Sequence, residues 1–274
     1  MELLPPPGRR CTRTVAQDRA KGPRGCALSS AAMSVAALVV GAGRGERFRA
    51  SLRGAPERAL PKAFLPLGGR TLLVRAAAAL AAAPEIDLVV PVVPAEALGA
   101  LGELAPGLAD VAKLAPAVAG GATRQDSVRA GLAALPRDVA LVAVHDAARP
   151  LVDPADVGRV VAEAARTGAA LLAAPIPDTV KRVREGRVVA TPPRDECFAA
   201  QTPQVFRADW LREALAKAEA DGVVATDDAA LVERLGVEVR VVAASAPNPK
   251  ITTAADLAWA EAWLARAAGG RGAR

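Results

Sequence analysis

The chain has 274 residues, enough to bury the core of one α/β domain, and its formal net charge of +6 comes from arginines spread along the sequence. Aromatic residues make up 3% and tyrosine is absent, which argues against stacking platforms for single-stranded nucleic acid. No basic helix or arginine stripe stands out, so we expect anionic small molecules and no nucleic acid as partners.

Residues 1–32 are predicted to be a disordered N-terminal extension, because their prolines, arginines and glycines show no periodicity. The apolar run over residues 27–40 could be read as part of a secretory signal, but cleavage near Ala42 would remove the glycine turn that follows. Three cysteines without pairing or metal-ligand spacing also favour a reducing compartment. We therefore expect a cytoplasmic protein with no membrane partner, whose domain begins near Met33.

A buried strand over Val35–Val40 is predicted to lead into a phosphate-binding turn. The apolar run breaks into three alternating glycines over residues 41–45, where backbone N–H groups can approach an anion without side chains in the way. Arg47 and Lys62 add positive charge beside this turn. The spacing matches neither the P-loop nor the dinucleotide fingerprint, so taken alone the turn is equally well explained as a strand-to-helix connection that avoids clashes.

The predicted elements after Lys62 alternate between helices and short apolar strands. In order, the chain predicts a helix over 71–83 capped by Thr71, a strand over 86–93, a helix over 95–104, a strand over 111–118, a helix over 126–135, a strand over 139–144, a helix over 154–167 capped by Asp153, and a strand over 169–174. This alternation predicts an α/β fold with a mostly parallel, Rossmann-like sheet and helices on both faces.

Polar or glycine-rich clusters directly follow three of the predicted strands. They occupy residues 41–47, 120–127 and 146–149. Because the carboxyl ends of parallel strands meet at one edge of a sheet, we expect these clusters to form a single ligand crevice.

Residues 177–195 are predicted to form a protruding β-hairpin arm with a tight turn at Glu185-Gly186. Its strands alternate charged and apolar residues and have too little apolar surface to be stable alone. We therefore expect the arm to pack on a second copy of the chain and to make a homodimer. After the arm, the chain predicts helices over 208–221, 228–235 and 254–268, a strand over 237–243 and a frayed tail over 269–274, so that the domain spans 33–268.

Six short motifs occur in one order: GAGRGER ending at Arg47, PK ending at Lys62, DS at Asp126-Ser127, HDAARP over 145–150, DTVK over 178–181 and NPKIT over 248–252. With them the chain resembles the 2-C-methyl-D-erythritol 4-phosphate cytidylyltransferases of the non-mevalonate isoprenoid pathway, over about residues 35–268. The string VHDAARP over 144–150 is the most specific of these motifs, whereas the glycine turn is shared by many nucleotidyltransferases.

The resemblance implies an enzyme that joins CTP and methylerythritol phosphate and releases pyrophosphate, with Mg²⁺ as cofactor. Two alternatives stay open: a cytidylyltransferase for another polyol phosphate, such as ribitol 5-phosphate, and a non-catalytic nucleotide-binding protein. Pro247 and Pro249 stand where some members carry acidic and aliphatic residues. No protein ligand is therefore assigned to the metal, which the CTP phosphates would mainly hold.

The resemblance also implies roles for individual residues. Arg47 and Lys62 would stabilise the charge on the α-phosphate and the leaving pyrophosphate, whereas Arg194 and Lys250 would position the sugar phosphate. The nucleotide-binding candidates are Gly41, Ala42, Gly43, Gly45, Gly120, Gly121, Ser127, Asp146 and Ala147, and the substrate-binding candidates are Arg149, Thr179, Thr202 and Thr226. Arg194 and Thr179 belong to the arm, which in the family crosses to the other protomer, so the site would be shared across a dimer.

The implied chemistry agrees with a chain that has one histidine and no recognisable Ser-His-Asp set. The attacking phosphate monoester is already anionic at neutral pH and needs no general base, so the main requirement is for cations that bring two polyanions together. His145 is accordingly expected to be structural, and Asp227 and Asp228 to be helix-terminus acids. Asp146 is either a ligand contact or a loop cap, and Arg124 faces either phosphate or solvent.

One segment departs from the family pattern. Residues 48–60 form an insertion between Arg47 and Lys62 that is longer than typical and contains Arg49, Arg53 and Arg58. We expect this insertion to be a mobile lid over the triphosphate.

Overall fold

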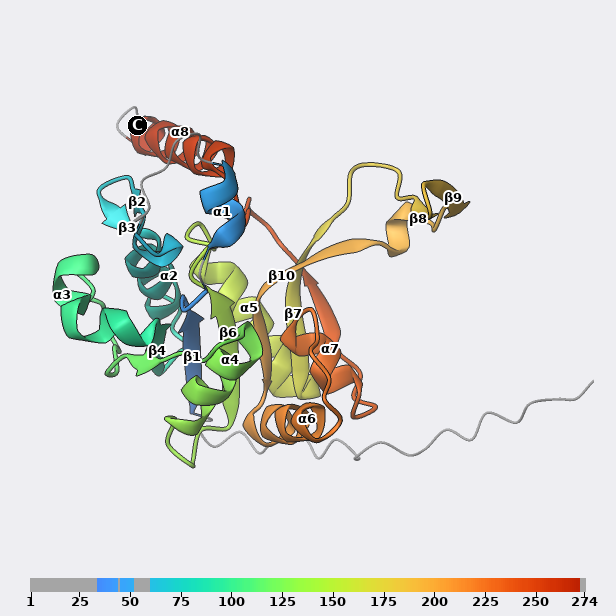
Figure 1. Ribbon diagram of the computed structural model, residues 1–274, viewed down its shortest axis with the longest axis horizontal. Helices are drawn as coiled ribbons and strands as arrows, with labels where there is room; N and C mark the ends of the chain where they lie inside the picture. Colours follow the sequence, from blue (N-terminus) through green and yellow to red (C-terminus); the bar gives the residue numbers. More distant parts are fainter. Residues whose placement is uncertain (1–33, 44, 52–59, 272–274) are drawn as a thin grey trace, which may run out of the picture.

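The computed structural model describes residues 34–43, 45–51 and 60–271. Its centre is a seven-stranded sheet in the order β11-β7-β10-β6-β1-β4-β5, in which β10 alone among these strands runs antiparallel to its neighbours (Figure 1). The strands are β1 (Val35–Val40), β4 (Leu88–Val93), β5 (Val118–Ala119), β6 (Leu141–Asp146), β7 (Ala169–Pro175), β10 (Phe198–Arg207) and β11 (Arg240–Ala243). The mostly parallel α/β sheet predicted from the sequence is therefore confirmed.

Helices cover both faces of this sheet because the side chains of each strand alternate between them. In β1, Ala37 and Val39 belong to the apolar cluster of one face, and Ala36 and Leu38 to that of the other. The first face is covered by α2 (Leu72–Ala81) and α5 (Pro154–Thr167), and the second by α4 (Arg124–Ala133), α6 (Ala208–Ala220) and α7 (Asp228–Glu233). Burying one leucine-sized side chain contributes about 1.5–3 kcal/mol, so the two faces together fix the sheet.

A smaller apolar cluster, here called the outer cluster, lies beside the sheet. It consists of Phe48, Leu67, Leu72, Ile251 and Ala260. These residues join α1 (Glu46–Ser51), the short hairpin of β2 (Pro66–Leu67) and β3 (Arg70–Thr71), and α8 (Ala254–Arg271). The outer cluster thus connects segments that lie about two hundred positions apart along the chain.

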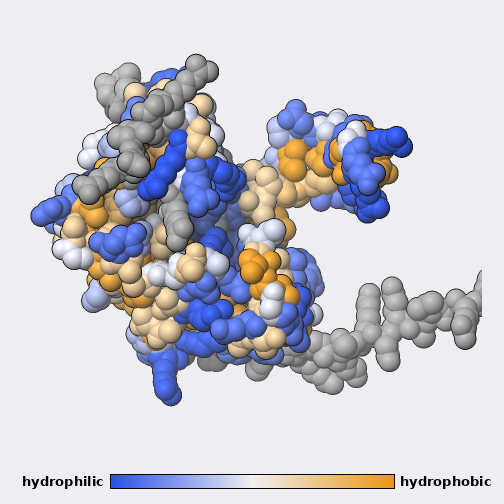
Figure 2. Space-filling model, in the orientation of Figure 1, coloured by the Kyte–Doolittle hydropathy of each residue, from blue (hydrophilic) through white to orange (hydrophobic). Residues whose placement is uncertain are grey.

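The predicted arm stands away from the body of the molecule (Figure 1). It consists of β8 (Arg182–Arg184) and β9 (Arg187–Ala190), and its turn has positive φ at both Glu185 and Gly186, as a tight hairpin turn requires. Val183 and Val188 are 55% and 59% exposed. Figure 2 shows hydrophobic and hydrophilic residues side by side on the arm. The predicted hairpin is therefore confirmed, and two of its valines are uncovered in the single chain.

Several predicted helix starts are also confirmed, whereas some strands differ. Thr71 accepts a hydrogen bond from the N–H of Val74, and Asp153 from that of Ala155. The strand predicted over 111–118 is wrong: apart from one isolated bridge at Leu114, regular pairing is confined to β5, because Lys113 adopts a φ of 60° that interrupts an extended strand. Residues 95–104 are helical but divide into η2 (Ala95–Ala100) and α3 (Leu101–Leu104).

The predicted extension over 1–32 and the middle of the insertion, 52–59, lie outside the described residues. Helix α8 continues to Arg271, so the tail does not fray at 269 as predicted. None of the described helices is long and apolar enough to cross a membrane.

Gly168 is predicted to tolerate no side chain. It ends α5 at a φ of 89°, and a Cβ there would lie 2.2 Å from the buried ring of Trp210. Gly168→Ala should lower the free energy of unfolding by about 2–4 kcal/mol, from strain in the left-handed region plus overpacking. The control Gly222→Ala has a φ of 64° but open space around the new methyl group, and should lower it by about 1 kcal/mol. Urea denaturation measures both, and equal losses would contradict the role of Trp210.

Candidate active site

An open cavity of about 390 Å³ lies at the carboxyl ends of β1 and β6. The described residues that line it are Val40, Gly41, Gly43, Gly45, Glu46, Arg47, Phe48, Lys62, Ala63, Ala122, Arg124, Asp146, Ala147, Ala148 and Lys250. Three predicted catalytic cations, Arg47, Lys62 and Lys250, therefore face one space although they are far apart in the sequence. Arg194, the fourth, does not line it.

The two predicted glycine turns pack against each other beside this cavity. The N–H groups of Gly41 and Gly120 donate to the carbonyls of Val92 and Val93, at 2.7 and 2.8 Å, at the end of β4. A Cβ on Gly120 would lie only 2.3 Å from that of Ala42, so a side chain there would push the turns apart. The Ser127 hydroxyl accepts a hydrogen bond from the N–H of Gly121 at 3.2 Å. The expected convergence of strand-end clusters is confirmed.

The ammonium group of Lys62 lies in an environment that disfavours its positive charge. Its Nζ donates to the carbonyl of Ile251 at 2.9 Å. Burial, together with the positive charges of Lys250 and Arg47, lowers the pKa of Lys62 from its usual 10.5 to about 8. The cavity thus has an excess of positive charge, which a bound polyanion would neutralise.

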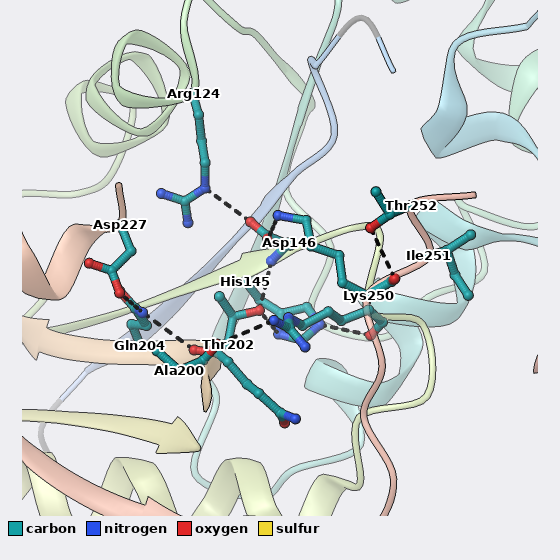
Figure 3. A network of polar contacts seen from close by, with 12 residues as sticks. Arg124, His145, Asp146, Ala200, Thr202, Gln204, Asp227, Lys250, Ile251 and Thr252 are labelled. Carbon is teal, nitrogen blue, oxygen red and sulfur yellow. Dashed lines mark hydrogen bonds and ion pairs between the residues drawn. The ribbon is translucent and has the colours of Figure 1, made fainter. Parts of the chain in front are cut away.

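Asp146 is the buried anion of the cavity. Its Oδ2 lies 2.6 Å from Lys250 Nζ and its Oδ1 lies 3.0 Å from Arg124 Nε. Figure 3 shows these three side chains reaching toward one another from the end of β6, the start of α4 and the segment after β11. Burial of the carboxyl group acts to raise its pKa, but the charges of Arg124 and Lys250 outweigh burial and hold that pKa well below its usual range. Asp146 is therefore ionised, and it is not merely a loop cap.

His145 and Thr202 hold the backbone of Asp146 in place through a chain of hydrogen bonds. The fully buried His145 ring places Nε2 3.0 Å from the Arg149 carbonyl, which can only accept, so Nε2 donates. Nδ1 is then free to accept from the Thr202 hydroxyl at 3.1 Å, and the hydroxyl oxygen in turn accepts from the N–H of Asp146 at 3.1 Å. The structural role predicted for His145 is confirmed. The buried Thr202 side chain thus supports Asp146, and its predicted contact with substrate stays a prediction.

The remaining predicted substrate residues lie outside the lining of the cavity. Arg149 donates from Nη1 to the carbonyl of Asn248 at 2.7 Å and holds the segment that carries Lys250. Thr226 is exposed just before α7. Thr179 and Arg194 lie on the arm, where Arg194 donates from Nη1 to the carbonyl of Pro177 at 3.0 Å. Their contacts with substrate stay predictions.

Sequence reasoning missed two buried amide side chains that shape the site. Asn248 donates from Nδ2 to the carbonyl of Thr202 at 2.9 Å and so places Lys250 two residues later. Gln204 accepts from the N–H groups of Asp228 and Ala229 at 3.1 and 2.9 Å, and thereby fixes the start of α7. Asn248 opens the NPKIT motif and could have been singled out, whereas no local signal marks Gln204.

The described residues contain no group of three or more His, Cys, Asp or Glu side chains that could hold a metal ion.

The fold and the cation-lined cavity place the chain among the α/β nucleotidyltransferases. A family model described as 2-C-methyl-D-erythritol 4-phosphate cytidylyltransferase matches residues 35–266, and the chain belongs to this family.

Relatives of that name support the assignment along nearly their whole length. The one from Desulforamulus reducens is 41% identical over 234 residues, which cover 85% of this chain and 97% of the relative. The one from Nocardia farcinica is 48% identical over 238 residues, covering 86% and 96%. The crystal structure of the protein from Thermus thermophilus superposes with a TM-score of 0.64 at 39% identity, and covers 85% of this chain and 100% of its own.

His145 should make stability pH-dependent in a defined window. Burial lowers its pKa from its usual 6.5 to about 4, so between these values the unfolded chain binds a proton that the folded chain does not. The free energy of unfolding should therefore fall as the pH drops from 6.5 toward 4, by on the order of 1–3 kcal/mol. Because this is the single histidine of the chain, His145→Asn should flatten the pH 5–6.5 part of the curve from urea unfolding. An unchanged slope would contradict the assignment.

Proposed function

We propose that this protein transfers the cytidylyl group of CTP to 2-C-methyl-D-erythritol 4-phosphate, giving 4-diphosphocytidyl-2-C-methyl-D-erythritol and pyrophosphate in isoprenoid precursor biosynthesis. Membership of the family supports the reaction, since relatives 41% and 48% identical carry the name of this enzyme. The observation on this chain that carries the proposal is the gathering of Arg47, Lys62 and Lys250 around one cavity between two glycine turns. The three cysteines show no pairing pattern in their sequence spacing, which favours a cytoplasmic location.

The reaction requires two anions to meet. An oxygen of the acceptor phosphate forms a bond to the α-phosphorus of CTP, and the bond from this phosphorus to the oxygen bridging to the β-phosphorus breaks, so that pyrophosphate leaves with the electron pair. The attacking oxygen is already anionic and gives up no proton in the step. His145 is buried and committed to Arg149 and Thr202, in keeping with chemistry that uses no general base.

Each half of the site has its own task in this proposal. Ala42, Gly43 and Gly45 offer backbone N–H groups to the triphosphate, and Gly41 borders it although its own N–H is bonded to Val92. Gly120, Gly121 and Ser127 hold the cytosine. Arg47 and Lys62 stabilise the charge that builds on the α-phosphate and the leaving group, while Lys250 draws in the acceptor phosphate. Asp146 and Ala147 border the space between them, and Arg149, Thr179 and Thr226 serve the polyol side.

We also propose Mg²⁺ as the cofactor, held mainly by the CTP phosphates. Asp146 is the buried carboxylate of the cavity, but its two oxygens are engaged by Arg124 and Lys250, which leaves the nucleotide as the principal source of ligands. When bound, the ion would neutralise phosphate charge and align the triphosphate. EDTA should accordingly abolish turnover without unfolding the protein.

The arm is proposed to join two chains and to complete each site. Val183, Val188 and Val189 are exposed on the hairpin, and a second copy of the chain would cover this apolar surface. Arg194 lies on the arm and does not line the cavity of its own chain. This supports the proposal that Arg194 reaches the cavity of the second chain.

Lys62→Ala tests the function. With CTP and 2-C-methyl-D-erythritol 4-phosphate, the wild type should release pyrophosphate, and the variant should lose at least about 10²-fold in kcat because charge on the leaving group is no longer stabilised. The thermal midpoint of the variant should hold, since removing Lys62 relieves its charge repulsion with Lys250 and Arg47. The exposed Lys217→Ala on α6 is the matched control. Faster turnover with ribitol 5-phosphate would favour that alternative, and CTP binding without pyrophosphate release the non-catalytic one.

Mixed protomers test the shared site. Lys62→Ala and Arg194→Ala should each be inactive alone, but mixing and re-equilibrating them should restore about a quarter of the wild-type rate. Half of randomly paired dimers contain one chain of each kind, and one of their two sites is then intact. A pyrophosphate assay after mixing measures the gain, with size-exclusion chromatography as the check on assembly. A monomer, or a mixture no more active than its parents, would rule out the shared site.

A further inference from the structure

Arg124 has no task in the reaction described above, yet it lines the cavity and contacts two acidic side chains at once. Its Nε lies 3.0 Å from Oδ1 of Asp146, and its Nη2 lies 2.8 Å from Oδ2 of Asp228. Lys250 Nζ lies 2.6 Å from the other oxygen of Asp146. Asp228, Arg124, Asp146 and Lys250 thus form a row of alternating charges, here called the charge row, that ends at the cavity.

Both acidic members of the charge row are shielded from water. The side chains of Asp146 and Asp228 are 10% and 1% exposed. A buried carboxylate that loses its cation is strongly unfavourable, because neither water nor another charge replaces the lost contact. If a substrate phosphate drew Lys250 away, and Asp146 had no other cation, Asp146 would be left as an unpaired buried carboxylate. The phosphate would also be repelled by the negative charge of Asp146. Arg124 holds the opposite oxygen and keeps Asp146 paired whichever partner Lys250 has.

We propose that Arg124 is a positioning residue for the acceptor: by staying paired with Asp146, it allows Lys250 to exchange that carboxylate for the phosphate of the polyol substrate. The inference rests on the function proposed above, because it takes Lys250 to bind the acceptor phosphate. The sequence left open whether Arg124 faces phosphate or solvent; in the structure its side chain lines the cavity and pairs with two carboxylates.

The local structure aims Arg124 at both carboxylates. It is the first residue of α4, whose start is fixed by a capping box between Thr123 and Asp126. Asp228 is held in turn, because its N–H donates to Oε1 of Gln204 at 3.1 Å. A planar guanidinium can direct Nε and Nη2 toward two separate acceptors, which the single ammonium of a lysine cannot do with the same geometry.

A double-mutant cycle separates this role from a purely structural one. Arg124→Gln should raise the KM for the acceptor at least tenfold, the range expected when one partner of a buried charge pair is removed. In an Asp146→Asn background the same change should raise this KM less than about twofold, because no unpaired carboxylate remains at position 146. In an Asp228→Asn background the full rise should persist.

The matched control is Arg129→Gln. Arg129 lies on the same helix and also has two acidic partners, Asp126 at 3.5 Å and Glu219 at 3.1 Å, but it does not line the cavity. The KM of the Arg129→Gln variant for the acceptor should equal that of the wild type. Thermal midpoints of all variants show whether they fold. If Arg124→Gln fails to fold because Asp228 is left unpaired, the whole cycle is carried out in the Asp228→Asn background.

Two outcomes overturn the inference. An equal rise in KM with and without Asp146→Asn would show that Arg124 does not act through Asp146. If instead the rise in KM vanishes in the Asp228→Asn background, Arg124 acts by holding α7 in place through Asp228. A wild type that releases no pyrophosphate contradicts the proposed function separately, and the cycle is then measured by calorimetry as the Kd of inorganic phosphate, with the same pattern expected.

Discussion

Mutual repulsion among Arg47, Lys62 and Lys250 is the constraint on which the site depends. Burial is the main cause of the lowered pKa of Lys62, and the nearby positive charges of Lys250 and Arg47 lower it further. Each comes from a different segment: the start of α1, the 3-10 turn η1 (Lys62–Phe64) and the segment after β11. The fold brings these charges to one cavity, and the unbound protein therefore has an electrostatic preference for polyanions.

Features set by neighbouring residues were predictable from the sequence. Glycines directly after an apolar run indicated a turn open to anions, and Thr71 and Asp153 indicated helix starts, because each depends on contacts within a few positions. The convergence of the clusters followed from one further rule, that parallel strands end at the same edge of a sheet. The HDAARP and NPKIT motifs added the family to which the chain belongs, which the structure alone would have left at the level of a fold.

Features set by distant residues were not predictable. Strand β10 went unrecognised because Gln201–Gln204 is polar and its pairing with β7 shifts register between Ala200 and Gln204. Thr202 was assigned to the substrate by resemblance, but its hydroxyl serves Asp146, 56 positions away. Likewise, the partners of Arg124 lie 22 and 104 positions along the chain. A one-dimensional pattern shows which residues can carry charge, but the fold decides which of them meet.

The outer cluster has a consequence for the spacing of two cations of the site. Phe48 and Ile251 are both buried in it, and they directly follow Arg47 and Lys250 in the chain. The separation of these two cations therefore depends on apolar packing in the outer cluster. An exchange of one apolar side chain for another in the outer cluster would change their spacing while every ionic group of the site stays the same.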